Sequence, residues 1–462
     1  MQLTMWVQKA LQIRDAVRDT VRGPGTLAER VERNGDILML LVLALALILR
    51  LGFLGVFHNE MYTRDEKGYS HQALNWANGR GMGIAEDCPT SYRAPLYIVF
   101  LFPFFKFFGV QGYGEPLGLA QVLVSTISVY LVYRVGVEWR SKRVGLLGAL
   151  MMAVYPYNLY HDVQFYITFL FTFFMLLSVL GLLKLERTRS MKTAAWTGLC
   201  IGLAMLATSG PMVFFAPLAS FWLLWRWKSL RLATSRVAVI AGVALLTLTP
   251  WVIRNWQVHH AFVPLTTDSG RVFFKSYHPL TMHMLLTDLW VDKAPEPADG
   301  VSGPMGGIHK VGCGFLNGVT EVEADAFWKA KAATWIKENP EKVPGLAAMK
   351  FNLLWRPWMF PPKGAEGGNG AVILSASFMN WGYALSYGFV LLFAALEWLL
   401  ASKEQRKRTW LFVLLAIAFS LTYTITVAGT KYRIPFDSVM AVMAAASLWR
   451  WYDAWKARKP RA

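Results

Sequence analysis

The sequence contains several apolar runs that are long enough to cross a lipid bilayer. The first covers residues 36–57, and a run of about 18–20 apolar residues is the length that a transmembrane helix needs. Of the 462 residues, 55% are hydrophobic and 16% are charged, whereas a soluble domain carries about 25% charged residues. The chain is therefore predicted to be all-α and to fold as a polytopic integral membrane protein.

The predicted protein has about ten transmembrane helices, judged by length and hydropathy. They are placed near residues 36–57, 116–138, 144–160, 165–184, 193–208, 211–226, 236–257, 374–399, 409–428 and 434–451. Basic residues concentrate in the short connections between them, so the formal net charge of +18 indicates membrane topology rather than a nucleic-acid partner. These connections fall on the same side as the N-terminus, and the positive-inside rule makes that side cytoplasmic.

Two further apolar segments, residues 93–109 and 343–358, are predicted to lie flat on the outer membrane face as juxtamembrane helices. If the first one crossed the bilayer, the basic connections after it would change sides. Lys106, Lys350 and Arg356 lie inside these segments and suit an interfacial position better than a bilayer core. A shallow re-entrant path is the alternative.

This topology divides the chain into parts with different surroundings. They are a cytoplasmic or interfacial arm at residues 1–35, a transmembrane domain at 36–451 with external loops 58–115 and 258–373, and a basic cytoplasmic tail at 452–462. The most polar part of the second loop, residues 294–325, is interpreted as a lid over a site, because long loops in compact proteins are often functional. An ordinary loop is the alternative.

An acidic pair, Asp65 and Glu66, stands where the first span meets water. A glycosyl transfer needs a base that takes the acceptor proton, or a carboxylate that holds a metal ion near the leaving phosphate. Chemistry on a lipid-linked substrate at the membrane face would explain the pair. The alternative is that both carboxylates only stabilise the N-terminus of the helix that follows.

Basic residues on the outer side predict a pocket for a phosphate group. Arg93 opens the first juxtamembrane segment, Arg254 closes a span, and Arg433 opens the last span after Lys431 and Tyr432. Guanidinium groups bind phosphate oxygens through charge-assisted hydrogen bonds. The alternative for each is an interfacial anchor whose charge reaches the headgroups.

Three polar residues are predicted to add to this site. Arg50 lies inside the first span, where a charge is costly and therefore indicates function. It is expected to face a phosphate or to pair with a carboxylate, and snorkelling to the interface is the alternative. His161 and Asp162 are placed in a short outer connection on the same side as Asp65, where they line the site or form an ordinary polar loop.

The three cysteines have no metal-ligand spacing. Cys88 and Cys313 fall in the two external loops, where an oxidising compartment would allow a disulfide between them, and two free thiols are the alternative. Cys200 is expected to be a buried free thiol.

Several short motifs occur in an order and spacing that are typical of one superfamily. They are Asp65-Glu66-Lys67-Gly68-Tyr69, Gly79-Arg80-Gly81, Arg93-Ala94-Pro95-Leu96-Tyr97, Phe107-Phe108-Gly109, Pro250-Trp251 with Arg254-Asn255, the segment from Lys331 to Asn339-Pro340, and Tyr432-Arg433-Ile434-Pro435. Together they resemble the GT-C glycosyltransferases. The similarity is to bacterial relatives of the dolichyl-phosphate-mannose protein mannosyltransferases (family 39) and of the lipid A aminoarabinose transferase (family 83).

This resemblance implies an inverting hexosyl or pentosyl transfer from a polyprenyl-phosphate sugar on the outer face of a membrane, here a bacterial inner membrane. The acceptor would be a glycolipid, a polysaccharide or a protein of the cell envelope. Asp65 matches the family's acidic residue that activates the acceptor or binds a divalent cation such as Mg or Mn, and Arg93 matches the basic residue that contacts the donor phosphate. Tyr69 completes the first motif.

The sequence departs from the family pattern in two places. Thr168 stands where many relatives carry an acid before Leu170-Phe171, which puts metal binding in doubt unless Asp162 substitutes for it. Thr208-Ser209-Gly210-Pro211 lacks the arginine of a Thr-Arg-Pro turn. Two other functions therefore stay open: a transporter or flippase of amphiphilic lipids, and a scaffold without catalysis. No inverted repeat supports a transporter.

Overall fold

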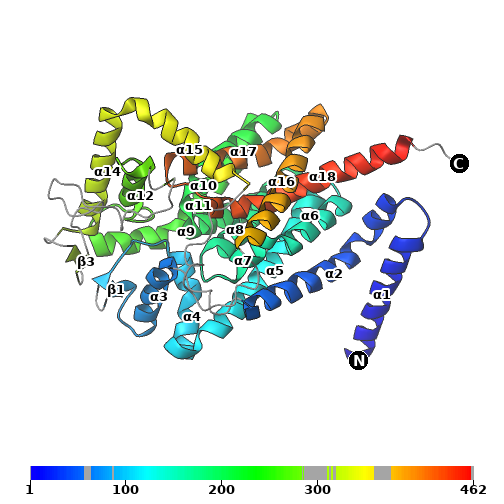
Figure 1. Ribbon diagram of the computed structural model, residues 1–462, viewed down its shortest axis with the longest axis horizontal. Coiled ribbons are helices and arrows are strands. Elements are labelled where there is room, and N and C mark those ends of the chain that lie inside the picture. The colour runs from blue at the N-terminus through cyan, green and yellow to red at the C-terminus, as the bar shows by residue number, and fades with distance from the viewer. Residues whose placement is uncertain are drawn as a thin grey trace.

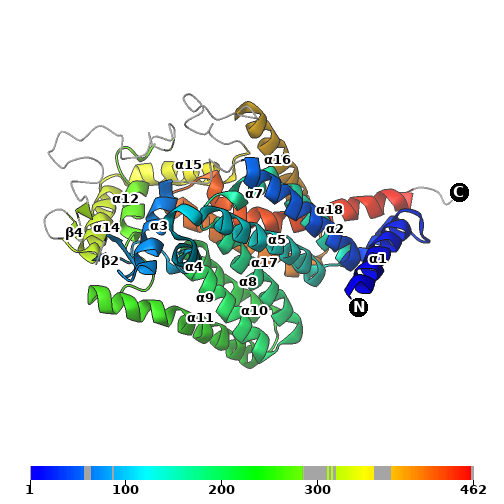
Figure 2. The ribbon, with the colours of Figure 1, turned by 90° about the horizontal axis from the view of Figure 1, so that it is seen from below.

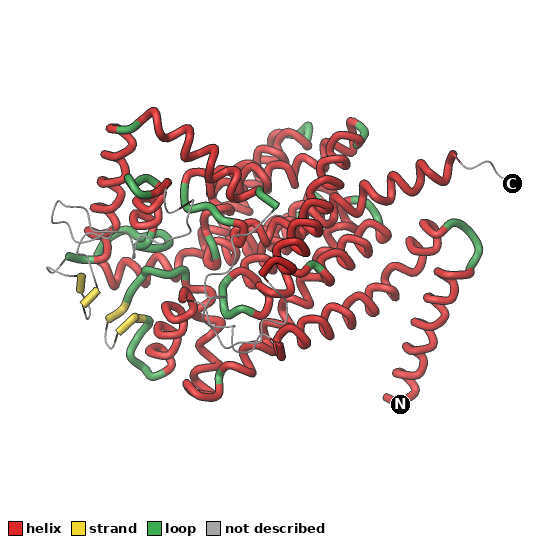
Figure 3. Tube along the Cα trace, viewed as in Figure 1, coloured by secondary structure: helices red, strands yellow, loops and turns green. Residues whose placement is uncertain are grey.

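The computed structural model describes residues 2–56, 64–85, 88–282, 285, 310–311, 314–315, 319–357 and 376–458. Helices make up most of this part of the chain, and the strands are confined to two short hairpins at one end of the molecule (Figure 3). β1 (Gly83–Ala85) pairs with β2 (Cys88–Pro89), and β3 (Lys310–Val311) pairs with β4 (Gly314–Phe315). The predicted all-α, polytopic membrane fold is confirmed.

The helices of the membrane domain follow the predicted spans closely. They are α2 (Leu27–Val56), α5 (Gly114–Trp139), α6 (Lys142–Val154), α8 (Thr168–Thr188), α9 (Met191–Ala207), α10 (Ser209–Arg226), α11 (Leu230–His259), α16 (Ala376–Leu400), α17 (Lys403–Ile425) and α18 (Ile434–Arg458). In the described residues, seven helices are long and apolar enough to cross a membrane. One of these is α4 (Pro95–Gly112), which we had expected to lie flat, and its orientation stays a prediction.

The predicted span at 144–160 is wrong in its second half. α6 ends at Val154, and Tyr155 has an extended conformation with φ −68° and ψ 112°. Pro156 then starts a separate helix, α7 (Pro156–Val163). Proline has no backbone N–H and disfavours a helical residue before it, which favours the break at Tyr155. The segment around His161 is consequently a buried helix rather than the polar loop that we expected.

Close backbone contact joins the central helices. A Cβ atom added to Gly136 on α5 would lie 2.4 Å from the Cα atom of Gly145 on α6. One added to Gly148 would meet the backbone of Val442 on α18 at 3.1 Å. Small residues let transmembrane helices approach to this distance, which strengthens their dispersion contacts.

The two ends of the bundle carry different elements. α1 (Gln2–Arg22) and the end of α18 lie at the right in both views, whereas α12 (Ser269–Ser276), α14 (Glu321–Glu338) and the hairpin strands lie at the left (Figures 1 and 2). α3 (Arg64–Ala77) packs along α4 near the left end. The N- and C-terminal helix ends are thus on one side of the molecule, opposite the segments of the second predicted external loop.

Ion pairs join the basic connections at the end of the bundle that carries α1 and the end of α18. The Glu397 carboxylate is fully buried and contacts Arg140 at 2.5 Å and Arg450 at 2.9 Å. Glu186 contacts Arg226 at 2.5 Å and Arg408 at 3.2 Å. These residues come from connections far apart in the sequence, so the expectation that the basic connections share one side agrees with the structure.

The second external loop forms a small layer with its own core. α12 and α14 pack together with α15 (Val343–Trp355), which follows the short turn η4 (Pro340–Lys342). Phe274, Tyr277, Trp328 and Leu346 are buried between them. The side chain of Thr320 caps α14 through a reciprocal capping box with Glu323. Most of the stretch at 294–325 that we interpreted as a lid lies outside the described residues.

Candidate functional site

The acidic pair lies in the first turn of α3. Asp65 and Glu66 follow Arg64, where α3 begins, and their side chains are outside the part of the chain that the structure describes. Carboxylates at this position stabilise the N-terminus of a helix through its dipole. Residues four apart share one face of a helix, which places Asp65 above Tyr69. The catalytic role of the pair stays a prediction.

Tyr69 and Arg93, two of the predicted site residues, contact each other. The Arg93 guanidinium carbon lies 5.1 Å from the centroid of the Tyr69 ring and 5.3 Å from that of Tyr92. Tyr69 is buried, and its ring meets the ring of Tyr97 edge to face with centroids 5.2 Å apart. A guanidinium at such distances from aromatic rings is attracted by their negative faces. The rings therefore orient Arg93 beside α3.

A chain of hydrogen bonds continues from these rings into the bundle. The Tyr97 hydroxyl donates to Gln121 Oε1 at 3.0 Å, and Gln121 Nε2 donates to the carbonyl of Gln164 at 3.0 Å. Tyr97 and Gln121 are both fully buried. Gln164 caps the C-terminal end of α7. The first external loop is thus fixed to α7 by side chains that we had not singled out.

α7 carries the two polar residues predicted for the outer connection. The Asp162 carboxylate pairs with Arg50 of α2, with Oδ2 at 2.7 Å from one terminal guanidinium nitrogen and 2.9 Å from Nε. Both side chains are buried, so Arg50 pairs with a carboxylate and does not snorkel. The His161 ring contacts Tyr157 with centroids 4.5 Å apart. Asp162 is therefore engaged in an ion pair and does not point into an open loop.

The motif before the last span forms a short helical turn, η5 (Thr430–Arg433). Lys431 Nζ lies 5.3 Å from the ring centroids of both Tyr166 and Tyr432. The Thr430 hydroxyl is 3.1 Å from that of Tyr157 on α7. Because Tyr166 follows Gln164 closely in the chain, Lys431 lies beside the same segment that the first external loop reaches through Gln121.

Arg433 is used differently from the prediction. Its guanidinium is fully buried, donates to Asp437 at 2.8 Å and to the Leu354 carbonyl at 2.7 Å, and also donates to Tyr383. The Tyr387 ring lies 3.4 Å from the guanidinium carbon. These contacts tie η5 to α15, α16 and α18. The structure thus gives Arg433 a positioning role.

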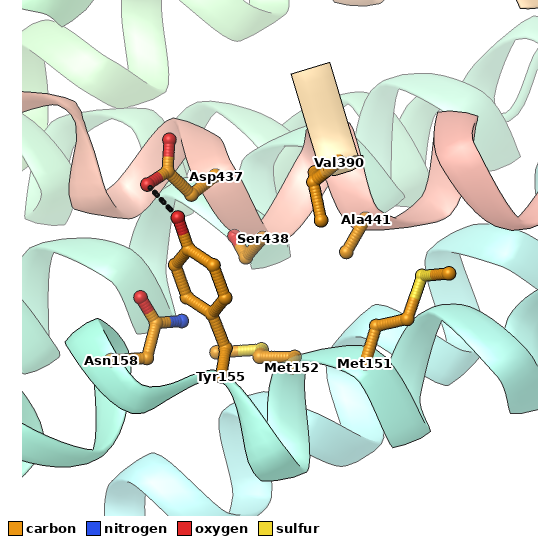
Figure 4. Close-up of a pocket in the computed structure, with 8 residues that line it drawn as sticks. All are labelled: Met151, Met152, Tyr155, Asn158, Val390, Asp437, Ser438 and Ala441. Atoms are coloured by element: carbon orange, nitrogen blue, oxygen red, sulfur yellow. Dashed lines mark hydrogen bonds between the residues drawn. The ribbon is translucent and has the colours of Figure 1, made fainter. Parts of the chain in front are cut away.

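A hollow lies beside this arginine. Figure 4 shows Tyr155, Asn158, Met151 and Met152 on one side, and Val390, Asp437, Ser438 and Ala441 on the other. The Tyr155 hydroxyl donates to Asp437 at 3.2 Å. Asn158 Oδ1 is buried and has no hydrogen-bond partner in the described structure. Neither Asn158 nor Asp437 was predicted, because each lies in an apolar stretch with no motif.

Arg254 belongs to a second polar cluster. It donates to the carbonyls of Met82 and Thr90 at 2.9 Å and to the Ser91 hydroxyl at 2.8 Å, and it lies 4.9 Å from the Trp251 ring centroid. Arg254 thus binds the loop that leads to Arg93. Arg433 makes its contacts elsewhere, with α15, α16 and α18.

Glu321, at the start of α14, completes the second cluster. Its carboxylate accepts from the Thr267 hydroxyl at 2.8 Å and from the Ser91 amide at 3.1 Å, and it also accepts from Thr90. His259 Nε2 lies 2.8 Å from the Ser91 hydroxyl and 3.7 Å from Glu321. The two external loops are therefore joined through one half-buried carboxylate, which no sequence pattern had indicated.

The described residues contain no group of three His, Cys, Asp or Glu side chains that could hold a metal ion. Since the Asp65 and Glu66 side chains are not among them, the predicted divalent cation stays untested. Cys88 is in a disulfide, and Cys200 is a buried free thiol as expected. The predicted partner of Cys88, Cys313, lies outside the described residues.

Comparison with protein families gives a match to the dolichyl-phosphate-mannose-protein mannosyltransferase model over residues 92–254, which is less than half of the chain. A comparison with curated protein sequences gives no match.

Several solved structures resemble this one. The archaeal oligosaccharyltransferase AglB from Archaeoglobus fulgidus, in complex with an inhibitory peptide and a dolichol-phosphate, is 13% identical and has a TM-score of 0.54 over 92% of this chain and 52% of its own. The same organism's oligosaccharyltransferase in complex with Zn and sulfate gives 16% identity and a TM-score of 0.51 over 89% of this chain and 49% of its own.

ArnT from Cupriavidus metallidurans, bound to undecaprenyl phosphate, gives 14% identity over 89% of this chain and 78% of its own, but its TM-score of 0.39 is too low to support an argument. The chain spans about half the length of the oligosaccharyltransferase. At these identities the likeness concerns the fold, and at that level the predicted resemblance to the GT-C superfamily of membrane glycosyltransferases is confirmed.

Proposed function

We propose that this membrane protein is a glycosyltransferase that moves a sugar from a polyprenyl-phosphate donor to an acceptor of the cell envelope. The observation that supports it most is the contact chain from Arg93 through Tyr69, Tyr97 and Gln121 to the end of α7. It holds the Arg93 guanidinium against Tyr69, which follows Asp65 by one helical turn of α3, at the end of the bundle where the external segments gather. The match to the mannosyltransferase model covers the same Arg93 loop.

In the proposed reaction, an acceptor hydroxyl or amine attacks the anomeric carbon of the sugar. The bond between that carbon and the phosphate oxygen breaks, and the polyprenyl phosphate leaves with the electron pair. Asp65 takes the proton of the acceptor as a general base, which typically contributes about 10²–10⁴-fold to the rate. Attack opposite to the leaving group inverts the anomeric configuration. Glu66 is the second candidate for the base.

The leaving phosphate needs positive charge at the membrane face. Arg93 and Lys431 are the two predicted cations proposed for this role, because each lies against two tyrosine rings. Tyr432 and Tyr69 supply these rings. A cation preorganised in this way stabilises the charge that develops on the phosphate without having to reorganise. Arg50, His161, Asp162, Arg254 and Arg433 would act by holding these groups in place.

A divalent cation such as Mg or Mn is proposed only as an addition to this site. Asp65 would hold it with a carboxylate oxygen, and the ion would then neutralise charge on the leaving phosphate. The oligosaccharyltransferase that is similar in fold has a structure in complex with Zn. None of the proton steps above depends on the metal.

The active site would face the periplasm or the outside of a bacterial inner membrane, with both termini in the cytoplasm. The separation of the two ends of the bundle supports this orientation (Figure 1). The basic connections lie at the end that carries the termini, and cytoplasmic loops are enriched in Lys and Arg. The acceptor would then be a glycolipid, a polysaccharide or a protein outside the membrane.

The experiment that tests this proposal measures sugar transfer by purified protein in lipid nanodiscs. A panel of radiolabelled polyprenyl-phosphate sugars is offered with an envelope lipid extract, and wild type is compared with Asp65→Asn. Glu115→Gln, an exposed acid in the first turn of α5, is the matched control for a helix N-terminal carboxylate. We expect transfer by wild type and by Glu115→Gln, and at least a hundredfold loss in Asp65→Asn. Equal transfer by all three would exclude Asp65 as the base.

A further inference from the structure

A buried lysine lies in the external layer without any acceptor for its charge. Lys350, on α15, has no exposed surface, and its Nζ atom has no hydrogen-bond partner in the described part of the chain. Its Nζ atom lies 4.0 Å from the centroid of the Tyr277 ring, at the C-terminal end of α12. An aromatic ring attracts an ammonium group but does not replace the hydrogen bonds that water gives it. Among the described residues, no carboxylate therefore pairs with Lys350.

The position of Lys350 relates it to the proposed active site. Lys350 and Leu354 are four residues apart and share one face of α15. The Leu354 carbonyl accepts a hydrogen bond from Arg433 of η5, and α15 packs against this turn. We call Lys350, Leu354 and the turn Thr430–Arg433 the α15–η5 seam. Lys431, the cation proposed to stabilise the leaving phosphate, lies on the same turn.

The cations at the α15–η5 seam differ in whether a described carboxylate neutralises them. Arg433 is neutralised by Asp437. His278, next to Tyr277, is buried, and burial lowers its pKa. Burial also lowers the pKa of Lys350 to about 7, with no charged group contributing to the shift. Near neutral pH, only a fraction of the Lys350 side chains is therefore protonated. A bound anion would stabilise the protonated form.

We propose that Lys350 is an anion-binding residue, which takes a phosphate group at the α15–η5 seam when its Nζ atom leaves the Tyr277 ring. The proposal rests on the proposed function for its ligand, because the phosphate at this membrane face would be that of the polyprenyl carrier. The four-carbon stem of lysine lets the ammonium swing away from the ring while the helix stays in place. A buried cation that costs stability and lacks a partner is the kind of residue that is retained for binding.

The test is carrier binding to the full protein in neutral phosphatidylcholine nanodiscs, at pH 6 and at pH 8.5. Wild type is compared with Lys350→Met and with Lys342→Met, an exposed control that carries no part of the seam. For wild type we expect affinity for polyprenyl phosphate to fall at least tenfold from pH 6 to pH 8.5, because the free amine loses its proton. Lys350→Met should bind weakly at both pH values, and Lys342→Met should match wild type.

Thermal unfolding separates a binding role from a merely structural one. Removing a buried, unpartnered ammonium should raise the melting temperature of Lys350→Met above that of wild type at pH 6. Since the folded-state pKa is lowered, the penalty is full below about pH 7 and fades toward the pKa of the unfolded chain, near 10.4. The gap should therefore narrow at pH 9. If Lys350→Met does not fold, Lys350→Gln replaces it.

Further ligands identify the source of the phosphate. A Lys350-dependent response to polyprenyl phosphate alone supports the lipid carrier, and one to inorganic phosphate or to phosphatidylglycerol supports a phosphate site with another occupant. Equal binding by Lys350→Met and wild type at both pH values would overturn the proposal. The assay needs no sugar transfer, so a transferase failure with Lys350-dependent binding would reject only the proposed function.

Discussion

The two ends of the bundle use their cations in different ways. At the end that carries the termini, arginines pair with buried or half-buried carboxylates, as Arg140 and Arg450 do with Glu397. At the opposite end, Arg93, Lys350 and Lys431 each rest against tyrosine rings. A carboxylate neutralises a cation, whereas an aromatic ring attracts and orients it without cancelling its charge. The first arrangement suits a scaffold and the second suits a binding site.

Arg433 offers the sharpest way to break this comparison, because it stands at the ligand end but pairs with a carboxylate. We expect Arg433→Met to lower the free energy of unfolding by about 3–5 kcal/mol, since it leaves Asp437 buried without its partner. Unfolding in mixed detergent micelles measures this. Lys431→Met should leave stability nearly unchanged but weaken carrier binding. If Arg433→Met weakened carrier binding and Lys431→Met lowered stability instead, Arg433 would again be the candidate ligand of the phosphate.

Glu397→Gln tests the scaffold end. The substitution removes the charge that two arginines share, and we expect a loss of about 3 kcal/mol, at the lower end of the range for breaking a buried ion pair. Sugar transfer per folded molecule should stay within about twofold of wild type. A large drop in the turnover of correctly folded protein would show that the two ends are coupled.

Arg93→Ala tests the ligand end. Losing the contact with the tyrosine rings should cost only about 0.5–1 kcal/mol of stability. Donor turnover should fall much more, by about a hundredfold, because a preorganised donor to the leaving phosphate is lost. Arg93→Lys should recover part of that turnover. If stability and turnover fell together to the same small extent, Arg93 would be an anchor rather than a ligand.

The smallest effect is expected for an exposed pair at the scaffold end. Arg143 contacts Asp453 at 2.7 Å, but both side chains reach solvent. Arg143→Ala should cost no more than about 1 kcal/mol, and added salt should reduce the difference from wild type. If Arg143→Ala lost as much stability as Glu397→Gln, burial would not explain how strongly each ion pair stabilises the protein.

Much of the fold was predictable because its main signal is local. A span such as α2 is an apolar run that can be recognised without knowing its neighbours. The break at Pro156 was also visible in the sequence, but the apolar residues around it suggested one continuous span. The sequence assigned Tyr69 and Arg93 to the same candidate site, but their contact appears only in the structure.

The rest of the site depends on partners that are distant in the sequence. Glu321 accepts hydrogen bonds from residues that precede it by more than 200 positions as well as from Thr267. Nothing near Glu321 distinguishes it from any other acid at the start of a helix. The same limit applies to Arg433, which was predicted to belong to a phosphate pocket. Its burial against Tyr383 and Tyr387 appears only in the assembled bundle.

The hydrogen bonds of Glu321 also bear on how the proposed substrates would reach the site. The carboxylate fastens the hairpin loop of the first external segment to the start of α14 in the second. If one segment moved away from the membrane alone, the hydrogen bonds between Glu321 and the first external segment would break. The donors of these bonds would then lose their acceptor. The described parts of the two loops should therefore behave as one mechanical unit. A long-chain carrier would then enter sideways, from the lipid, while an acceptor approaches from the aqueous side.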